Sequence, residues 1–174
     1  MVLRIIAGEA RGRPLHTPAG SDVRPSTARV REATFNSLHS QGRLQGAEVL
    51  DLFAGTGALG LEALSRGAAS ATFVERDPAA LTALRANLAT TGYEARGRVV
   101  AGDVMAELPR LGRHYGVALC DPPYRFDAWE DLLAGIPADV VVAEADRPVV
   151  PGSAWEVIKQ RRYAGTVVVI AARR

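Results

Sequence analysis

From residue 48 onward the chain alternates short apolar runs with segments of helical spacing, and this alternation limits the possible folds more than any other feature. Leu81, Leu84 and Leu88, for example, recur at helical intervals between Pro78 and Gly92. The predicted strands are 49–53, 70–75, 98–101, 115–120, 140–143, 155–160 and 166–171, and the predicted helices of this region are 58–65, 78–91 and 105–111. Strands that alternate with helices in this way are typical of a mostly parallel sheet with helices on both faces. The sequence therefore predicts a doubly wound α/β fold.

The length of 174 residues and the mass of 18.5 kDa fit a single globular domain. Hydrophobic residues make up 48% of the chain and charged residues 23%, a balance typical of ordered proteins. The single cysteine excludes an internal disulfide, and the three histidines show no zinc-binding spacing, so no metal is expected. The longest apolar run is too short to span a membrane, and the first residues lack a signal-peptide pattern, so we expect a cytoplasmic protein.

The first 25 residues differ from the rest and are predicted to form a hairpin-like extension to a domain of residues 26–174. Residues 3–7 and 14–18 are predicted to be extended pieces on either side of a basic turn, and Ser26 or Thr27 is predicted to cap a helix that runs to about His39. Residues 1–31 hold six arginines and two acids, although the whole chain carries a formal net charge of only +2. Because arginine binds phosphates through two parallel hydrogen bonds, this segment is predicted to grip a nucleic-acid backbone, with a solvated surface as the alternative. The predicted RNA-binding residues are Arg11, Arg13, Arg24, Arg29 and Arg31.

A glycine-rich turn follows the first predicted strand of the alternating region. Gly55, Gly57 and Gly60 allow a sharp turn in which backbone amides approach a ligand in front of a helix N-terminus. Together with an acid at Glu75, these glycines match a dinucleotide fingerprint, so a nicotinamide cofactor is one interpretation. A tight turn that binds nothing is another.

Asp51 favours a different ligand from a dinucleotide. A carboxylate at this strand end would repel a pyrophosphate but would attract the ammonium group of S-adenosylmethionine, and at 4 Å the energy is about 4 kcal/mol for an effective dielectric constant of about 20. A capping or turn role is the alternative for Asp51. Glu75 is placed to accept both ribose hydroxyls. Asp103 is placed to meet the adenine amino group, or else to cap the following helix.

The sequence Asp121-Pro122-Pro123-Tyr124 ends the fourth predicted strand. Two prolines cannot continue a central ladder, because neither has an amide hydrogen to donate. A carboxylate and a nearby carbonyl can together accept both hydrogens of a planar exocyclic amine, which favours the pyramidal transition state whose lone pair attacks a methyl group. Tyr124 offers a surface for base stacking, worth about 1–3 kcal/mol. A strand-ending turn with a buried tyrosine is the alternative.

If the first and fourth strands flank the point where the strand order reverses, Gly55 and Asp121 face one crevice. These features resemble class I S-adenosylmethionine-dependent methyltransferases that act on amines, and most of the chain resembles the bacterial RsmD family, which methylates guanine N2 in small-subunit (16S) ribosomal RNA. The matching segments are Arg4–Gly8 with Arg11–Arg13, Arg24–Asn36, Asp51–Gly60, Glu75, Asp121–Tyr124, and Arg162, Tyr163 and Thr166. One departure is Ala28, where the family usually has aspartate.

The resemblance implies a Rossmann-like, seven-stranded sheet whose last strand is antiparallel, with 16S ribosomal RNA, within a small-subunit particle, as the partner. It also implies two groups of site residues. The cofactor-binding residues are Asp51, Phe53, Gly55, Gly57, Glu75 and Asp103, and the catalytic residues are Asp121, Pro122, Pro123 and Tyr124.

Other functions stay open on the sequence alone. Adenine N6 in DNA or RNA, or a protein glutamine, could replace guanine as the methyl acceptor. A nicotinamide-dependent oxidoreductase would explain the glycines but not residues 121–124, and a non-catalytic RNA-binding module would methylate nothing. Cys120, Trp129 and Trp155 are predicted to pack in the core.

Overall fold

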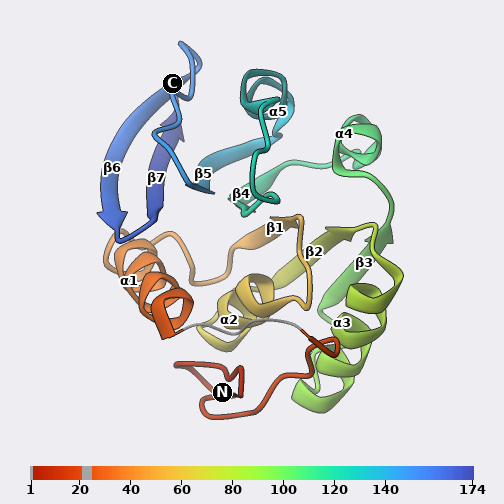
Figure 1. Cartoon of the computed structure of the whole chain (residues 1–174). Helices are drawn as coiled ribbons and strands as arrows, with labels where there is room; N and C mark the ends of the chain where they lie inside the picture. Colours follow the sequence, from red (N-terminus) through yellow and green to blue (C-terminus); the bar gives the residue numbers. More distant parts are fainter. Residues whose placement is uncertain (1, 21–24) are drawn as a thin grey trace.

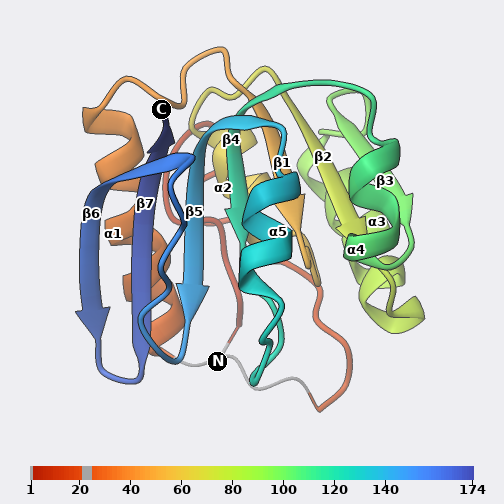
Figure 2. The same ribbon diagram turned by 90° about the horizontal axis from the view of Figure 1, so that it is seen from above.

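The computed structural model describes residues 2–20 and 25–174. Within these residues seven strands form one sheet in the order β3-β2-β1-β4-β5-β7-β6 (Figures 1 and 2). The strands are β1 (Glu48–Leu52), β2 (Ser70–Glu75), β3 (Gly97–Ala101), β4 (Tyr115–Cys120), β5 (Ala138–Ala145), β6 (Trp155–Tyr163) and β7 (Thr166–Arg173). β7 runs antiparallel to both of its neighbours, β5 and β6, while the other pairs are parallel. The predicted doubly wound sheet with an antiparallel last strand is confirmed.

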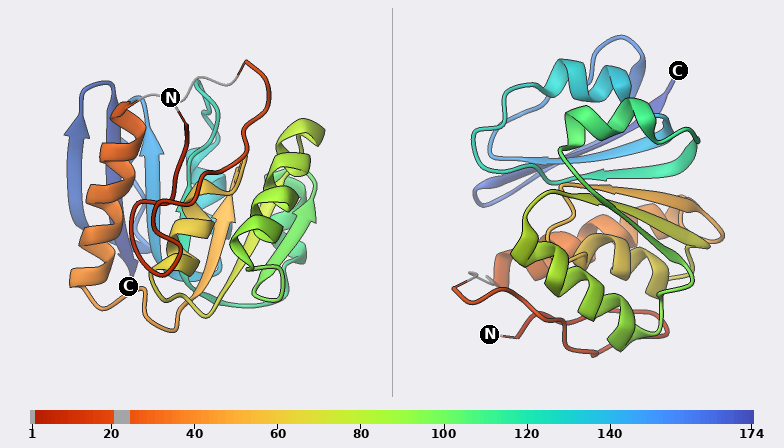
Figure 3. Two further views of the ribbon diagram at one scale, coloured as in Figure 1. Left: turned by 90° about the horizontal axis from the view of Figure 1, so that it is seen from below. Right: turned by 90° about the vertical axis from the view of Figure 1, so that its right-hand side faces the viewer.

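Helices cover both faces of the sheet. On one face lie α1 (Pro25–Ser40), α2 (Ala58–Ser65) and α3 (Pro78–Thr91), and on the other lie α4 (Val104–Glu107) and α5 (Trp129–Gly135) (Figures 1 and 3). A single 3-10 turn, η1 (Leu108–Arg110), follows α4. Alternate residues of β4 enter separate cores: Val117 and Leu119 pack under α1–α3, whereas Ala118 and Cys120 pack under the opposite face. The central strands are therefore apolar throughout because both of their faces are buried.

Local signals set several boundaries as the sequence predicts. The Asp77 side chain accepts a hydrogen bond from the Ala80 amide at 2.8 Å, Pro78 takes the first turn, and Gly92 ends α3 with φ of 76°. The predicted bounds of α2, β2 and β4 are also confirmed. Cys120 and Trp155 lie in the core as expected. None of the described helices is long and apolar enough to cross a membrane.

Three helices differ from the sequence prediction. The predicted helix 105–111 is instead α4 followed by η1, because Pro109 cannot donate the backbone hydrogen bond that would continue an α-helix. α1 begins at Pro25, so Ser26 and Thr27 lie inside its first turn instead of capping it, since the fixed φ of proline suits the first helical position. α5 was not predicted, because seven residues are too few to establish helical periodicity. Its signal was the spacing of Trp129, Leu132 and Leu133, all of which are buried.

The strand order reverses between β1 and β4. β1 pairs with β2 on one side and with β4 on the other, and Leu52 is the register partner of Cys120. On the next strand, Ala143 is the register partner of Cys120. The residues that follow β1 and β4 and the end of β5 are therefore neighbours at one edge of the sheet, where ligands of such folds bind.

The N-terminal segment forms a hairpin-like loop held by hydrogen bonds and a single bridge between Arg4 and Pro14, without regular strands. It crosses α2 between α1 and α3 (Figure 3), and buries Ile5, Ala10 and Leu15. Its turn is held by the buried Glu62, whose carboxylate accepts the amides of residues 6 and 7, and by Ser65 at the end of α2. Since α2 runs opposite to the strands, the hairpin turn lies at the far edge of the molecule from their carboxyl ends. The division into residues 1–25 and 26–174 stays a prediction.

Candidate active site

The glycine-rich turn connects β1 to α2, and two carboxylates hold it in place: the buried Asp51 and the half-buried Glu75. Asp51 Oδ2 accepts the Gly60 amide at 2.9 Å, and Glu75 Oε2 accepts the Gly55 amide at 2.7 Å. Gly55 has φ of 57°, and a Cβ there would meet open space, so its backbone is accessible to a ligand. Gly57 has φ of 84°, but a Cβ there would lie 2.3 Å from Leu84 Cδ1. Gly57 therefore serves close helix packing, while Gly55 forms the open part of the turn.

Asp51 is 1% exposed, and its second carboxylate oxygen, Oδ1, has no hydrogen-bond partner in the described part of the chain. Burial raises the pKa of Asp51 well above its usual value, the Gly60 amide opposes that rise, and the charges of Asp121 and Glu75 add to it. A cation bound near Oδ1 would compensate this charge. Asp51 therefore holds an unpaired acceptor beneath the glycine turn, and its contact with an ammonium group stays a prediction.

A cavity of about 330 Å³ opens beside the glycine turn. Its lining residues come from the ends of four strands and from α4: Phe53, Glu75, Arg76, Gly102, Asp103, Val104, Met105, Asp121, Pro123 and Phe126. Glu75 lies on its wall with both oxygens bonded to backbone amides, which orients the carboxylate toward the ends of β1 and β2. The mixture of an aromatic ring, a thioether and oriented carboxylates suits an adenosine group.

Asp103 has a defined structural role. Its Oδ1 accepts the amides of Met105 and Ala106 at the start of α4, and its Oδ2 lies 3.3 Å from Arg76. The helix-capping alternative is thereby confirmed. Contact with an adenine amino group stays a prediction, although Asp103 does line the cavity.

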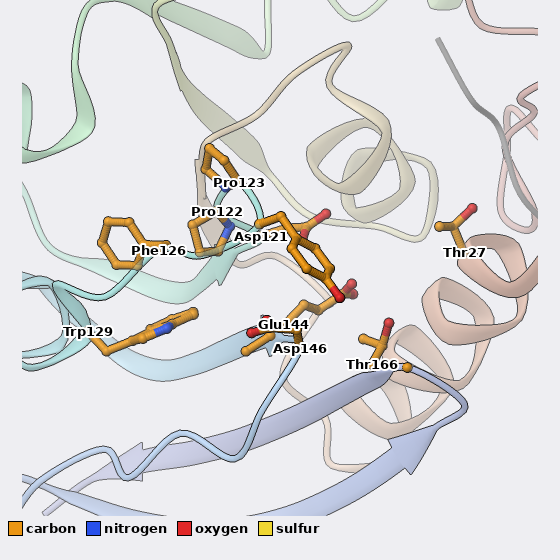
Figure 4. A pocket seen from close by; sticks show the side chains of 12 residues that line it. Thr27, Asp121, Pro122, Pro123, Phe126, Trp129, Glu144, Asp146 and Thr166 are labelled. Carbon is orange, nitrogen blue, oxygen red and sulfur yellow. The ribbon is translucent and has the colours of Figure 1, made fainter.

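A second cavity, of about 140 Å³, shares lining residues with the first. Figure 4 shows the side chains that line this second cavity. It is lined by Thr27, Asp121, Pro122, Pro123, Tyr124, Phe126, Trp129, Glu144, Ala145, Asp146, Gly165 and Thr166. Asp121, Pro123 and Phe126 line both cavities. Phe53, which follows β1, and Asp121, which follows β4, thus line one cavity. Asp51, Gly55 and Gly57 line neither cavity, so the expectation that Gly55 and Asp121 face one crevice stays a prediction.

Aromatic rings form the wall at this junction. Phe126 makes edge contacts with Phe53 and with Trp129, each with 5.3 Å between ring centroids. Trp129 is buried as predicted, but its remaining surface faces the second cavity. Tyr124 is 80% exposed, which contradicts the buried-tyrosine alternative and leaves its ring open for stacking. Sequence analysis missed Phe126. The sequence feature that could have indicated it is an aromatic residue only two positions after Tyr124, at the end of the same motif.

Sequence analysis also missed Glu144 and Asp146, which follow the buried part of β5 and face the second cavity. Asp121 and Glu144 make no hydrogen bond or ion pair within the residues that the structure describes. Burial raises the pKa of Asp121, and burial together with the nearby charge of Asp121 raises the pKa of Glu144 further. The second cavity therefore presents two carboxylates that lack protein partners.

Among the described residues, none of the arginines predicted to bind RNA lines either cavity. Arg13 donates to the Thr90 carbonyl, at the same far edge where Arg11 lies exposed on the hairpin turn. Arg31 is 5% exposed and donates to the Arg4 carbonyl, so it supports the hairpin and is not available to RNA. Arg29 is exposed on α1, and Arg24 lies outside the described residues. The prediction that Arg31 binds RNA is wrong, because its guanidinium is buried and bonded inside the protein. RNA binding by Arg11, Arg13 and Arg29 stays a prediction.

Across residues 2–20 and 25–174, His, Cys, Asp and Glu side chains form no group of three that could hold a metal ion. The chain matches the family described as conserved hypothetical protein 95 over residues 3–172. It is similar to ribosomal RNA small subunit methyltransferase D of Escherichia coli (strain K12), with 44% identity over 131 residues that cover 75% of this chain and 65% of that protein. The matched region is thus slightly less than two thirds of that relative.

A second relative matches almost end to end. It is the putative rRNA methyltransferase YlbH of Bacillus subtilis (strain 168), with 34% identity over 99% of this chain and 100% of that protein. Among solved structures, the putative methyltransferase yhhF from Escherichia coli has a TM-score of 0.88 and 35% identity, and covers 100% of this chain and 99% of that one. From the family match over residues 3–172 and these similarities, we conclude that the chain belongs to the conserved hypothetical protein 95 family, the RsmD family, and has the Rossmann-like class I methyltransferase fold.

Proposed function

We propose that this protein is an enzyme that transfers a methyl group from S-adenosylmethionine to the exocyclic N2 amine of a guanine in 16S ribosomal RNA. The observation that carries the proposal is the pair of cavities that meet at Asp121, one beside the glycine turn and one beside the Asp121–Tyr124 corner. The names of the relatives from Escherichia coli and Bacillus subtilis support rRNA as the substrate. We propose the cytoplasm as its location and a small-subunit particle as the form in which it meets the RNA.

The larger cavity would hold the cofactor. Asp51 would attract its ammonium group, the backbone at Gly55 would approach its methionine portion, and Glu75 would accept its ribose hydroxyls. Phe53 would pack against its adenosine portion and Asp103 would face the adenine amino group. When bound, S-adenosylmethionine supplies an electrophilic methyl group on a positively charged sulfur atom.

The smaller cavity would hold the target base, with Tyr124 stacked on its ring. Asp121 would accept one hydrogen of the amine, and the Pro122 carbonyl would accept the other. These two acceptors favour the pyramidal amine, whose lone pair is then available for attack. Asp121 would also take up the proton that the amine loses as it becomes methylated. Base extrusion costs a few kcal/mol, and less in a loop than in a duplex.

Two other functions remain as alternatives. An adenine N6 acceptor in RNA or DNA would use the same Asp121 corner. A nicotinamide-dependent oxidoreductase is disfavoured because it leaves the second cavity and its carboxylates without a role. Calorimetric titration separates the last alternative directly, since S-adenosylmethionine should bind and NAD should not.

The proposal is tested by radiolabelled methyl transfer to small-subunit particles from a strain that lacks this enzyme, followed by nucleoside analysis. We expect N2-methylguanosine. The Asp121→Ala variant should lose at least about 100-fold in methyl transfer, the loss typical of one group that stabilises a transition state, while it still binds the cofactor. Asp127→Ala, in the same loop and exposed, is the matched control and should keep its activity. Label in another nucleoside, or loss of cofactor binding together with activity, would contradict this assignment.

A further inference from the structure

Asp121 and Glu144 occupy equivalent positions on neighbouring parallel strands. Asp121 directly follows Cys120 on β4 and Glu144 directly follows Ala143 on β5, and Cys120 and Ala143 are register partners. Neighbouring strands lie about 4.8 Å apart, so the two side chains start from adjacent points at the sheet edge. Both line the smaller cavity, and in Figure 4 both extend toward the side on which Thr27 and Thr166 lie.

Glu144 has no partner inside the protein that explains its position. No hydrogen bond or ion pair joins its carboxylate to any residue within the described ranges. Arg31 is a nearby cation, but it donates to the Arg4 carbonyl at 2.6 Å and lies 3.8 Å from Glu62. Asp146, two residues further on, is paired with Arg147 at 3.3 Å. Glu144 is half-buried and lines the cavity, so a base that fills the cavity would remove the remaining water from its carboxylate. A carboxylate that loses its water without gaining a donor is costly, which points to a ligand that supplies that donor.

The chemistry of the bases shows which ligand would supply that donor. Guanine carries a ring N1–H directly beside its N2 amine, so this edge offers a continuous row of hydrogen-bond donors. Adenine and cytosine instead carry a ring nitrogen lone pair beside their amine, which would face a carboxylate unfavourably. With Asp121 at the amine, the neighbouring carboxylate of Glu144 is positioned for the next group along the edge.

We infer that Glu144 is a specificity-determining residue that accepts the N1–H of guanine while Asp121 accepts a hydrogen of N2. This inference rests on the proposed function. It explains why the enzyme would select guanine over bases whose ring nitrogen beside the amine carries no hydrogen. A site that hydrogen-bonds a substrate N–H rejects an analogue without it, because its own buried polar group is left unpaired. Specificity then comes from β5, a strand that none of the sequence motifs includes.

The test uses 2-aminopurine, which keeps the 2-amino group but has a lone pair at N1. Small-subunit particles are reconstituted with ligated rRNA that carries guanine or 2-aminopurine at the methylated position, and the ratio of the two kcat/KM values is measured. Burial raises the pKa of Glu144 to about 8, so the ratio is measured above pH 8, where its carboxylate is ionised. There we expect the wild-type enzyme to favour guanine by at least about 10- to 100-fold, the factor for one hydrogen bond to a charged group. Glu144→Gln has nearly the same shape, and its amide can either accept from guanine N1–H or donate to 2-aminopurine N1. It should therefore reduce the ratio to within about threefold of unity.

Asp139→Asn is the matched control, because it removes one negative charge from the same strand at an exposed residue that pairs with His114. It should leave the ratio as in the wild type. Equal transfer to both bases by the wild type would overturn the inference without any variant. A Glu144→Gln enzyme that is slower on both bases with an unchanged ratio would also overturn it, since a merely structural role lowers both rates together. Absence of transfer from the wild type to guanine would instead refute the proposed function.

Discussion

Glu62 is the residue whose replacement tests most directly how the N-terminal hairpin is held. It is 0% exposed, and its carboxylate accepts the amides of Ile6 at 2.8 Å and Ala7 at 3.0 Å. The same carboxylate accepts from Arg66 Nε at 2.8 Å and lies 3.8 Å from Arg31 Nε. In Glu62→Gln an amide group replaces one of these oxygens, so a donor faces another donor at the hairpin.

The cost follows from these contacts. A hydrogen bond to a charged group contributes about 1.5–3 kcal/mol, and removal of one partner of a buried ion pair costs about 3–5 kcal/mol. These two energies describe the same substitution and are not added together, so we expect the free energy of unfolding to fall by about 3–5 kcal/mol. That is a large part of the 5–15 kcal/mol typical of a domain. Because Glu62 holds the hairpin, the hairpin should also detach locally before the sheet unfolds.

Urea unfolding and amide hydrogen exchange measure the two effects. Exchange at Ile6 and Ala7 should become at least about 100-fold faster, which corresponds to about 2.7 kcal/mol, whereas β1 and β4 should remain protected. Glu48→Gln, at an exposed residue, is the matched control and should change stability by less than about 0.5 kcal/mol. A Glu62→Gln protein within 1 kcal/mol of the wild type, with unchanged exchange at the hairpin, would refute the reasoning.

Two further predictions concern the site itself. Burial raises the pKa of Asp121, and the charged groups around it are Asp51, Glu144 and, next to Glu144, Arg31. The kcat for methyl transfer should therefore be low where Asp121 is protonated, and should rise with pH through a value above the ordinary aspartate pKa of about 3.9. A pH–rate profile that is flat above pH 4 would contradict this prediction. Gly60→Ala would place a Cβ 2.3 Å from Phe73 Cε1 and 3.0 Å from Asp51 Oδ2. Urea unfolding should therefore show a free energy of unfolding lower by about 1–3 kcal/mol, and calorimetry should show a weaker affinity for S-adenosylmethionine. Gly116→Ala is the control and should be nearly neutral, because its nearest contact would lie at 3.5 Å.

Local chemistry explains why much of the fold could be predicted from the sequence. Short apolar runs, helical spacing, the cap at Asp77 and the stop at Gly92 are short-range signals, so the sheet class and several boundaries followed from them. Residues 121–124 could be assigned to a strand end because two prolines cannot join a central ladder. The short helix α5 could not be predicted, since so short a segment carries little periodic signal and is stabilised by burying Trp129 and Leu133 against the sheet.

The sequence by itself determined the alternating architecture, the glycine turn after β1 and the Asp121–Tyr124 corner, because each depends on backbone constraints within a few residues. Only the tertiary structure decided which side chains share a cavity. The register of β4 with β5 brings Glu144 beside Asp121, although 22 residues separate them in the chain. Folding likewise turned Arg31 inward and carried Arg11 and Arg13 to the far edge. Charge along a sequence does not reveal which face of the molecule carries it, because that depends on packing between distant segments.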